Sequence, residues 1–352
     1  MLEVEMLAAG HGDALIVRYG DNPVRRILID GGPWFAYEGD WGIRKRLGEL
    51  RDRGETDFEL LIVTHVDTDH IDGIIKLLQD PELDGIKFKD VWFNGWKHIQ
   101  KGATGVLGAL QGEMLGALLE EKGMRWNAHE KLGGGPVMVH PDGKLPIFEL
   151  EGDIRLTLVS PGPLELEELR KEWPKSLTSS GFTGPRDRDS VLAELERRAR
   201  YGPPAGVLGE KPDDKAANGS SIAVIAEHGG TVALLTGDAH APVLERALSR
   251  YAADHGGPLE VRDFKLPHHG SFSNITKNVI KLVRTKRYLI SSSSQFYGHP
   301  DENAIKLVLK HHQGGPPELV FNYRSPKTMP WYEGQDPAKY TATFATPAEW
   351  FP

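Results

Sequence analysis

The sequence predicts an α/β fold made of two similar halves, and three observations support this prediction. An apolar run at residues 60–63 passes into a polar loop and then a helical pattern. This is the order found where a buried strand of an open α/β sheet delivers side chains at its carboxyl end. The order of strands, helix and strand recurs in the second half of the chain, and ligand-type residues stand at strand ends in both halves.

Composition bounds the class of protein. A chain of 352 residues with a net charge of −8 and no cysteine can bury a large core, but it offers no disulfide and no thiolate ligand. The negative charge argues against a protein that coats nucleic acid. The first six residues lack a basic leader segment, and no apolar run is long enough to span a membrane. We therefore expect a soluble, cytoplasmic protein without a membrane partner.

Apolar periodicity predicts the elements of the first half. Alternating residues between turn signals predict strands at 2–7, 14–19, 24–30, 60–63, 86–93 and 154–159. Helical spacing predicts helices at 41–53, 71–78 and 106–121. Residues 131–144 are expected to form a loop.

Residues 164–217 interrupt this pattern, because charges dominate there and prolines and glycines break the periodicity. Within this stretch, residues 187–200 fit one exposed helix. We interpret the stretch as a charged insertion over the core rather than a linker. The chain is thus expected to be one domain, residues 1–352, with insertions at about 95–150 and 164–217.

The second half repeats the pattern. Strands are predicted at 220–226, 231–235, 259–266, 288–292 and 318–322. Helices are predicted at 242–251, 275–284 and 302–311, before an irregular aromatic tail.

Four potential metal ligands, His65, Asp67, Asp69 and His70, lie within six residues after the strand at 60–63. An extended loop would aim His65 and Asp67 to the same side, while Asp69 and His70 would begin the next helix. A helix cap needs one carboxylate or two, and no imidazole. The cluster therefore predicts a metal site that can surround two ions.

Other strand ends carry residues of the same kind, namely Asp30, Asp238, His268 and His269. Each has an alternative interpretation. Asp30 could be a turn former, Asp238 could cap the following helix, and adjacent histidines could lie on the surface. Their joint occurrence with the first cluster favours one shared site.

These motifs together resemble the metallo-β-lactamase superfamily, whose first ligand motif, HxHxDH, reads here His65-x-Asp67-x-Asp69-His70. The chain is most similar to the branch typified by the metallo-hydrolase domain of the DNA-uptake channel protein ComEC. The motifs that carry this similarity are Gly12-Asp13-Ala14, the Asp in place of the second His, Asn218-Gly219-Ser220-Ser221, Leu235-Thr236-Gly237-Asp238, Pro267-His268-His269-Gly270-Ser271 and Gly298-His299-Pro300.

The resemblance implies a four-layer αββα sandwich, the metallo-β-lactamase fold, with the site at one edge between the sheets. It also implies two divalent metal ions. The implied ligands are His65 and Asp67 for one ion, Asp69, His70 and His269 for the other, and Asp238 bridging them. By the same resemblance, His269 is preferred to His268 as the ligand because it directly precedes Gly270, and Asp30 is expected to orient a ligand.

One departure from the superfamily concerns the first ion. Members with two well-formed zinc sites usually have a further histidine where this chain has Asn218. The first site is therefore poorer in nitrogen, and Asp67 makes it richer in oxygen. Zinc is the expected metal, and the oxygen-rich set also permits manganese.

Two cations a few ångströms apart can hold a hydroxide and stabilise an anionic transition state, which suits phosphodiester hydrolysis. The candidate catalytic residues are Asp69, His268 and His299, with either histidine as proton donor to the leaving group. We expect a metal-dependent phosphodiesterase or nuclease-like hydrolase acting on a small-molecule or nucleic-acid phosphoester. The alternatives are hydrolysis of a carboxylic ester, lactone or amide, and a metal-binding interaction or sensing module of a larger system.

A basic stretch lies near the second histidine motif. Lys277, Lys281 and Arg284 recur at i, i+4 and i+7 of the helix predicted there, and Lys286 and Arg287 follow. A solvated helix face is the favoured interpretation, and a nucleic-acid surface is the alternative. No motif of a dedicated nucleic-acid module accompanies it.

Overall fold

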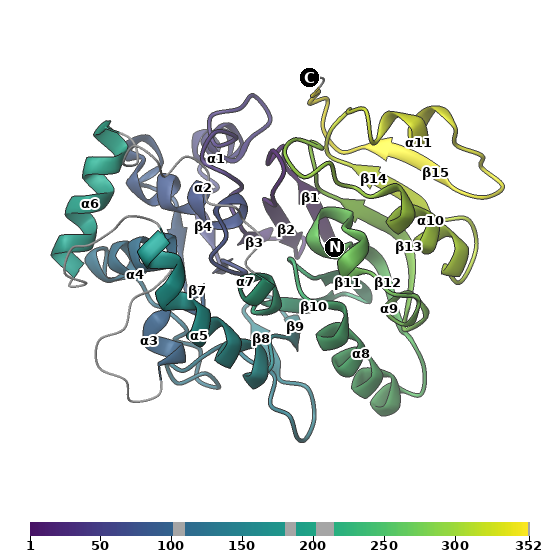
Figure 1. The fold of residues 1–352 in the computed structure, drawn as a ribbon, viewed down its shortest axis with the longest axis horizontal. Coiled ribbons are helices and arrows are strands. Elements are labelled where there is room, and N and C mark those ends of the chain that lie inside the picture. Colours follow the sequence, from purple (N-terminus) through teal and green to yellow (C-terminus); the bar gives the residue numbers. More distant parts are fainter. Residues whose placement is uncertain (101–109, 180–187, 202–214, 351–352) are drawn as a thin grey trace.

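A computed structural model describes residues 1–100, 110–179, 188–201 and 215–350, and it confirms a mixed α/β chain. One sheet has five strands in the order β1-β2-β3-β5-β7 (Figure 1). These strands are β1 (Leu2–Met6), β2 (Leu15–Tyr19), β3 (Arg25–Ile29), β5 (Leu60–Ile62) and β7 (Val91–Trp92). The β1–β2–β3 meander is antiparallel, and β5 and β7 continue it in parallel.

The second sheet has eight strands in the order β15-β14-β13-β12-β11-β10-β9-β8. Its strands are β8 (Ile147–Leu150), β9 (Ile154–Ser160), β10 (Ala223–His228), β11 (Thr231–Leu235), β12 (Leu259–Lys265), β13 (Val283–Ile290), β14 (Glu318–Phe321) and β15 (Thr341–Phe344). Strands β8 to β11 pair antiparallel, and β11 to β15 pair in parallel. Strands β4 (Asp57–Phe58) and β6 (Lys87–Phe88) pair in parallel and form a separate two-stranded sheet.

The helices of the first half are α1 (Ile43–Asp52), α2 (Thr68–Gln79), α3 (Trp96–Ile99) and α4 (Leu110–Glu121). The charged stretch contributes α5 (Pro163–Ser179), α6 (Arg188–Tyr201) and α7 (Lys215–Gly219). The last part contributes α8 (Ala241–His255), α9 (Lys277–Lys281), α10 (Glu302–His311) and α11 (Met329–Glu333). In the described part of the chain, no helix has the length and apolarity needed to cross a lipid bilayer.

Successive side chains of the first sheet point to opposite faces, and each face contributes to a different buried cluster. Val17 and Ile29 share one cluster with Leu158 and Leu234 of the second sheet. Ile16, on the other face of β2, belongs to a second cluster that includes side chains of α1, α2 and α4. The first sheet therefore packs against the second sheet on one face and against helices on the other.

Most predicted elements are confirmed, and three predictions were wrong in detail. The strand predicted at 86–93 is two strands, β6 and β7, which lie in different sheets. The helix predicted at 275–284 ends at Lys281, because the residues from Val283 alternate at period two and begin β13. The tail is not wholly irregular, since it forms α11 and β15.

The two predicted insertions lie only partly within the described residues. Helix α6 matches the bounds of the helix predicted at 187–200, but it is not exposed throughout, because Val191 and Leu195 are buried in the second cluster. Helix α5 was not predicted. Residues 101–109, 180–187 and 202–214 of these stretches lie outside the described residues. The single-domain assignment stays a prediction.

Glycines let the loop after β3 contact the backbone of α2 directly. Gly31 N donates to His70 O at 2.8 Å, and Gly73 N donates to Gly32 O at 2.8 Å. A Cβ added at Gly73 would lie 1.9 Å from Gly31 O, which is far inside van der Waals contact. This close approach fixes the start of α2 relative to the end of β3.

Gly73→Ala should therefore lower the free energy of unfolding by about 3 kcal/mol, because backbone must move to admit the methyl group. Gly48→Ala, in α1, meets nothing within 4 Å and should raise stability by about 0.5–1 kcal/mol. Urea unfolding of both variants measures the difference. Equal stabilities would contradict the contact between α2 and the loop.

Candidate metal centre

The ends of strands from both sheets meet at one cluster. Asp30 follows β3, His65 follows β5, Asp238 follows β11, and His269 follows β12. Asp69 and His70 lie in the first turn of α2, as the loop after β5 predicts. All of these side chains are buried.

Asp30 holds the cluster's first half together. Its carboxylate accepts from Thr64 N and from Thr64 Oγ1, each at 2.7 Å, and it lies 2.8 Å from His70 Nδ1. His70 therefore carries a proton on Nδ1 and turns Nε2 toward the cluster. Asp30 itself adopts a left-handed conformation with φ 57°, which is uncommon outside glycine.

Four ligand-type atoms converge from both halves of the chain. His70 Nε2 lies 3.3 Å from His269 Nε2, 3.4 Å from Asp238 Oδ2 and 3.8 Å from Asp69 Oδ2. His269 Nε2 lies 3.3 Å from each of the same two carboxylate oxygens. His269 Nδ1 donates to Ser291 O at 3.0 Å, which leaves Nε2 facing the cluster.

This spacing fits a four-coordinate metal ion. Ligand bonds of about 2.0–2.1 Å in a tetrahedron place neighbouring ligand atoms about 3.3–3.4 Å apart. The five separations given above run from 3.3 to 3.8 Å. His70, Asp238 and His269 therefore form the centre of a candidate site for one ion. Asp13 belongs to the group whose ligand atoms all lie within 4.8 Å of one another, and Asp69 Oδ2 lies 3.3 Å from His269 Nε2, so either aspartate can supply a fourth ligand.

Burial and opposite charges act against each other in this cluster. Burial by itself would lower the pKa of His70, but the carboxylates of Asp238, Asp69 and Asp30 raise it well above its usual value. For His269, burial also lowers the pKa, but the carboxylates of Asp238 and Asp13 raise it well above its usual value. The same histidines hold the pKa values of Asp69 and Asp238 below their usual range in spite of burial. Without metal, protons on the histidines balance the carboxylates.

A second group lies beside this one. His65 Nε2 is 3.5 Å from Asp67 Oδ2. Thr64 Oγ1 at 3.0 Å and Ser221 Oγ at 3.1 Å lie beside His65 Nδ1. Thr64 Oγ1 donates to Asp30, so it can act toward His65 Nδ1 only as an acceptor.

Unsatisfied atoms mark the same region. Within the described residues, His65 Nε2, Asn218 Oδ1 and Asp238 Oδ1 are buried and have no hydrogen-bond partner. Such atoms are costly unless something binds them. His65 Nε2 and Asn218 Oδ1 are atoms of the kind that a second ion would bind, whereas Asp238 Oδ1 lies 3.9 Å from the ammonium of Lys265.

The two candidate proton donors differ. His268 is partly exposed, its Nδ1 lies 3.0 Å from Asn274 Oδ1, and its Nε2 lies 3.7 Å from Asp238 Oδ2. His299 is joined to the cluster only through a ring contact with His268, at 5.4 Å between centroids. Burial and the neighbouring histidines lower the pKa of His299 to about 4, so it is neutral at pH 7. This charge state favours His268 over His299 as the proton donor.

Two residues of the cluster were not predicted as site residues. The fully buried ammonium of Lys265 forms an ion pair with Asp13, and it donates to Gly237 O at 3.0 Å. Asp13 Oδ1 also lies 3.3 Å from His269 Nδ1. Asp13 belongs with His70, Asp238 and His269 to the group whose ligand atoms all lie within 4.8 Å of one another. Lys265 pairs with its Oδ2, while its buried Oδ1 has no hydrogen-bond partner among the described residues. The sequence did indicate that Lys265 is buried, because it lies on the same face of its strand as Leu259 and Val261.

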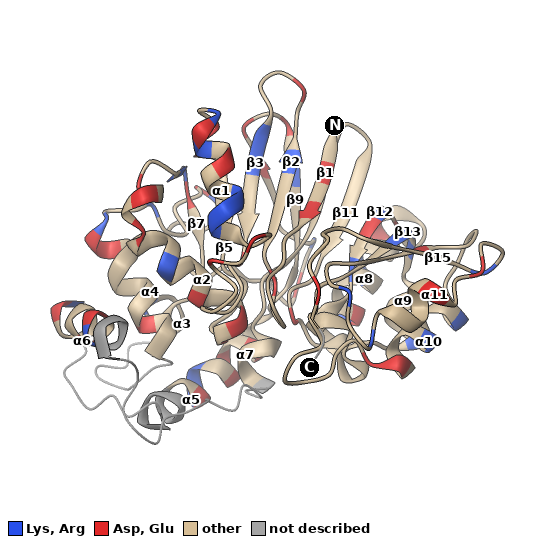
Figure 2. Ribbon diagram, turned by 90° about the horizontal axis from the view of Figure 1, so that it is seen from above, with Lys and Arg blue, Asp and Glu red and all other residues tan. Residues whose placement is uncertain are grey.

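The predicted basic helix face forms only in part, because Lys277 and Lys281 lie on α9 but Arg284 does not. Arg284 lies on β13 and pairs with Glu260 at 3.2 Å, while Arg287 pairs with Asp263 at 3.1 Å. Figure 2 shows Lys and Arg interspersed with Asp and Glu along the described ribbon. This distribution favours solvated charges over a nucleic-acid surface at this stretch.

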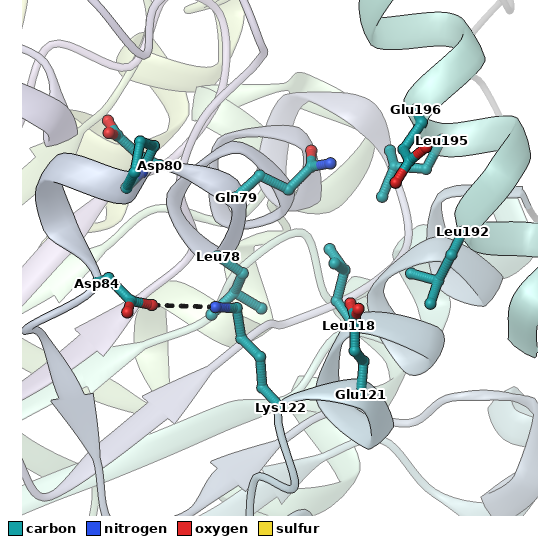
Figure 3. Close-up of a pocket in the computed structure, with 11 residues that line it drawn as sticks. Leu78, Gln79, Asp80, Asp84, Leu118, Glu121, Lys122, Leu192, Leu195 and Glu196 are labelled. Atoms are coloured by element: carbon teal, nitrogen blue, oxygen red, sulfur yellow. Dashed lines mark hydrogen bonds and ion pairs between the residues drawn. The ribbon is translucent and has the colours of Figure 1, made fainter.

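A surface hollow of about 560 Å³ lies elsewhere, between α2, α4 and α6 (Figure 3). Leu78, Leu118 and Leu192 line it together with charged side chains, and Lys122 pairs with Asp84 at 3.1 Å. The hollow meets the carboxyl end of α2, whereas Asp69 and His70 lie at its start. Eight residues of helix span about 12 Å, so the hollow is separate from the metal cluster.

Comparisons with known proteins add little beyond this geometry. No protein-family model matches the chain, and no curated protein is similar to it in sequence. Among solved structures, a candidate metal-dependent hydrolase from Parabacteroides distasonis is 11% identical, with a TM-score of 0.36 over 91% of this chain and 93% of that one. CmlA, a diiron β-hydroxylase from Streptomyces venezuelae, is 10% identical, with a TM-score of 0.40 over 88% and 51%. These scores are too low to assign a fold or a function.

Metal binding should release protons, because the raised pKa values of His70 and His269 keep protons where an ion would bind. We expect at least one proton per ion at pH 7, and an affinity for zinc that weakens as the pH falls. Calorimetry in buffers of different ionisation enthalpy measures the number released. The exposed variant His255→Ala should release the same number, and pH-independent binding without proton release would contradict the assignment.

Lys265→Met should destabilise the metal-free protein by about 3–5 kcal/mol, because it leaves Asp13 buried and unpaired. Asp13→Asn combined with Lys265→Met should recover most of this loss. Urea unfolding in the presence of a chelator measures both. Additive losses in the double variant would show that the two side chains do not act as a pair.

Proposed function

We propose that this chain is a metal-dependent hydrolase of the metallo-β-lactamase superfamily, that it has the four-layer αββα sandwich, and that it cleaves phosphoric esters. The main support is that His70 Nε2 and His269 Nε2 lie 3.3 Å apart and that Asp238 Oδ2 lies within 3.4 Å of both. The face-to-face packing of the two sheets supports the fold.

The chain's own residues prepare this site before any ion enters. Asp30 accepts a hydrogen bond from His70 Nδ1, and Ser291 O accepts one from His269 Nδ1, so both Nε2 atoms face the cluster. Bound divalent ions would activate water and stabilise negative charge on a phosphoryl oxygen. His268, held by Asn274 at the exposed edge, is placed to meet the leaving group.

The choice of a phosphoester rests on the resemblance to the ComEC-like branch and on charge. A cluster with four buried aspartates, Asp13, Asp30, Asp69 and Asp238, repels an anion unless cations intervene. Two divalent ions would neutralise these carboxylates and supply the cations that a phosphodiester binds. Zinc and manganese are the proposed metals.

The test is release of nitrophenol from bis(4-nitrophenyl) phosphate after loading with zinc or manganese. Asp238→Ala should lower kcat/KM by at least about 100-fold and reduce the bound metal, because it removes the shared carboxylate. The control Asp254→Ala removes an exposed carboxylate at the end of α8 and should leave both unchanged.

Three outcomes bear on the proposal. Turnover of nitrophenyl acetate or a lactone with none of the phosphodiester would replace phosphoester hydrolysis by carboxylic ester chemistry. Full activity of Asp238→Ala would refute the ligand assignment. A purified chain that binds no metal and turns over no substrate would favour an interaction module.

A further inference from the structure

Four exposed aromatic side chains lie together on two loops, one after β3 and one after β13. They are Trp34, Phe35, Phe296 and Tyr297, called the aromatic platform below, and their exposed fractions are 60%, 37%, 70% and 39%. The ring centroids are 6.0 Å apart for Trp34 and Phe35, and 6.1 Å apart for Phe35 and Phe296. Exposed rings in contact are costly in water unless a ligand covers them.

The platform leads directly to the metal centre. The buried ring of His11 lies 5.7 Å from Phe35, 5.1 Å from Phe296 and 5.5 Å from Tyr297. His11 is joined to the cluster by the next two residues, because a Cβ on Gly12 would lie 1.7 Å from Asp69 O and Asp13 N donates to Asp69 O at 3.3 Å. Its Nδ1 is buried and has no hydrogen-bond partner in the described part of the chain.

A second path runs from Tyr297 to the proton donor. The rings of Tyr297 and His299 are 6.4 Å apart, and those of His299 and His268 are 5.4 Å apart. His268 Nε2 is 3.7 Å from Asp238 Oδ2. The loop after β13 therefore reaches the cluster through ring contacts, and the loop after β3 joins it through Phe35 and Phe296.

The rings are held in place by the backbone. Gly10 has φ 60°, and a Cβ there would lie 3.1 Å from the ring of Phe35 and from Pro33. Lys76 Nζ lies 5.6 Å from the ring centroid of Trp34. Phe296 has φ 64°, a strained conformation for a bulky side chain, which keeps it turned out to solvent.

We propose that the aromatic platform binds a flat ring of the substrate, a nucleobase or a simple aryl group, while the metal centre holds the phosphate. This inference rests on the proposed phosphoesterase function and names its substrate class. A substrate ring, rather than a protein partner, is the occupant because the platform is small and continuous with a buried cluster of ligand-type atoms. Stacking on aromatic side chains is tolerant of the base, so we expect little base specificity.

The experiment compares three diesters that share the nitrophenol leaving group. They carry thymidine, phenyl or methyl on the other side of the phosphate. Phe296→Ala should lower kcat/KM for the thymidine diester by about 5- to 100-fold relative to the methyl diester. Phe35→Leu, which keeps apolar volume without a ring, should act in the same direction, and the control Tyr332→Ala removes an exposed ring on α11 and should change no ratio.

The phenyl diester distinguishes the two sources of the ring. A loss for thymidine alone assigns the platform to nucleobases, and equal losses for thymidine and phenyl assign it to flat rings in general. Equal changes for all three diesters, or none, would overturn the inference. Unchanged ratios together with a change in oligomeric state, measured by light scattering, would also overturn the inference. That result would assign the platform to a protein partner.

Binding separates this inference from the proposed function. Calorimetry of the zinc-loaded protein compares thymidine 5′-monophosphate with methyl phosphate. Tighter binding of the nucleotide that is lost in Phe296→Ala supports the platform even if no diester is hydrolysed. Equal affinities with normal hydrolysis would overturn the platform and leave the hydrolase standing.

Discussion

The carboxylate of Asp30 is the constraint on which the rest of the site depends. It accepts from Thr64 N and Thr64 Oγ1 and holds His70 Nδ1, so one buried group joins the end of β3, the end of β5 and the first turn of α2. Gly31 and Gly73 let these backbones meet without a side chain between them. Removing one partner of such a network leaves buried charge unpaired, at a cost of about 3–5 kcal/mol. The contacts among β3, β5 and α2 thus fix the orientation of the His70 ring.

The second half supplies the opposite side of the cluster. Asp238 and His269 arrive from neighbouring parallel strands, β11 and β12, and Lys265 adds a fixed positive charge. Buried carboxylates need compensation, and without metal they obtain it from Lys265 and from protonated histidines. Bound divalent ions would supply the positive charge that the protonated histidines supply in the metal-free protein. The proposed metal site and the stability of the two-half fold therefore depend on the same charge balance.

The sequence predicted the fold class and the cluster because both depend on local signals. Strand ends, helix starts and His/Asp spacing are readable over a few residues, and the structure brings His70, Asp69, Asp238 and His269 together. The sequence did not reveal the ion pair of Lys265, since its partner lies about 250 residues earlier in the chain. The aromatic platform was missed for the same reason, because its two loops meet only in the folded chain. The helix predicted at 275–284 was too long, because the residues from Val283 alternate at period two and form β13.

Anomalous diffraction at the zinc absorption edge locates each bound zinc ion relative to the proposed ligands. Crystals of the zinc-loaded protein should give a peak within about 2.0–2.2 Å of His70 Nε2, His269 Nε2, Asp69 and Asp238, with a second, weaker peak beside His65 and Asp67. The weaker peak follows from Asn218, which leaves that position with fewer nitrogen ligands. The absence of a peak between His70 and His269, or a zinc ion held elsewhere in the chain, would contradict the account.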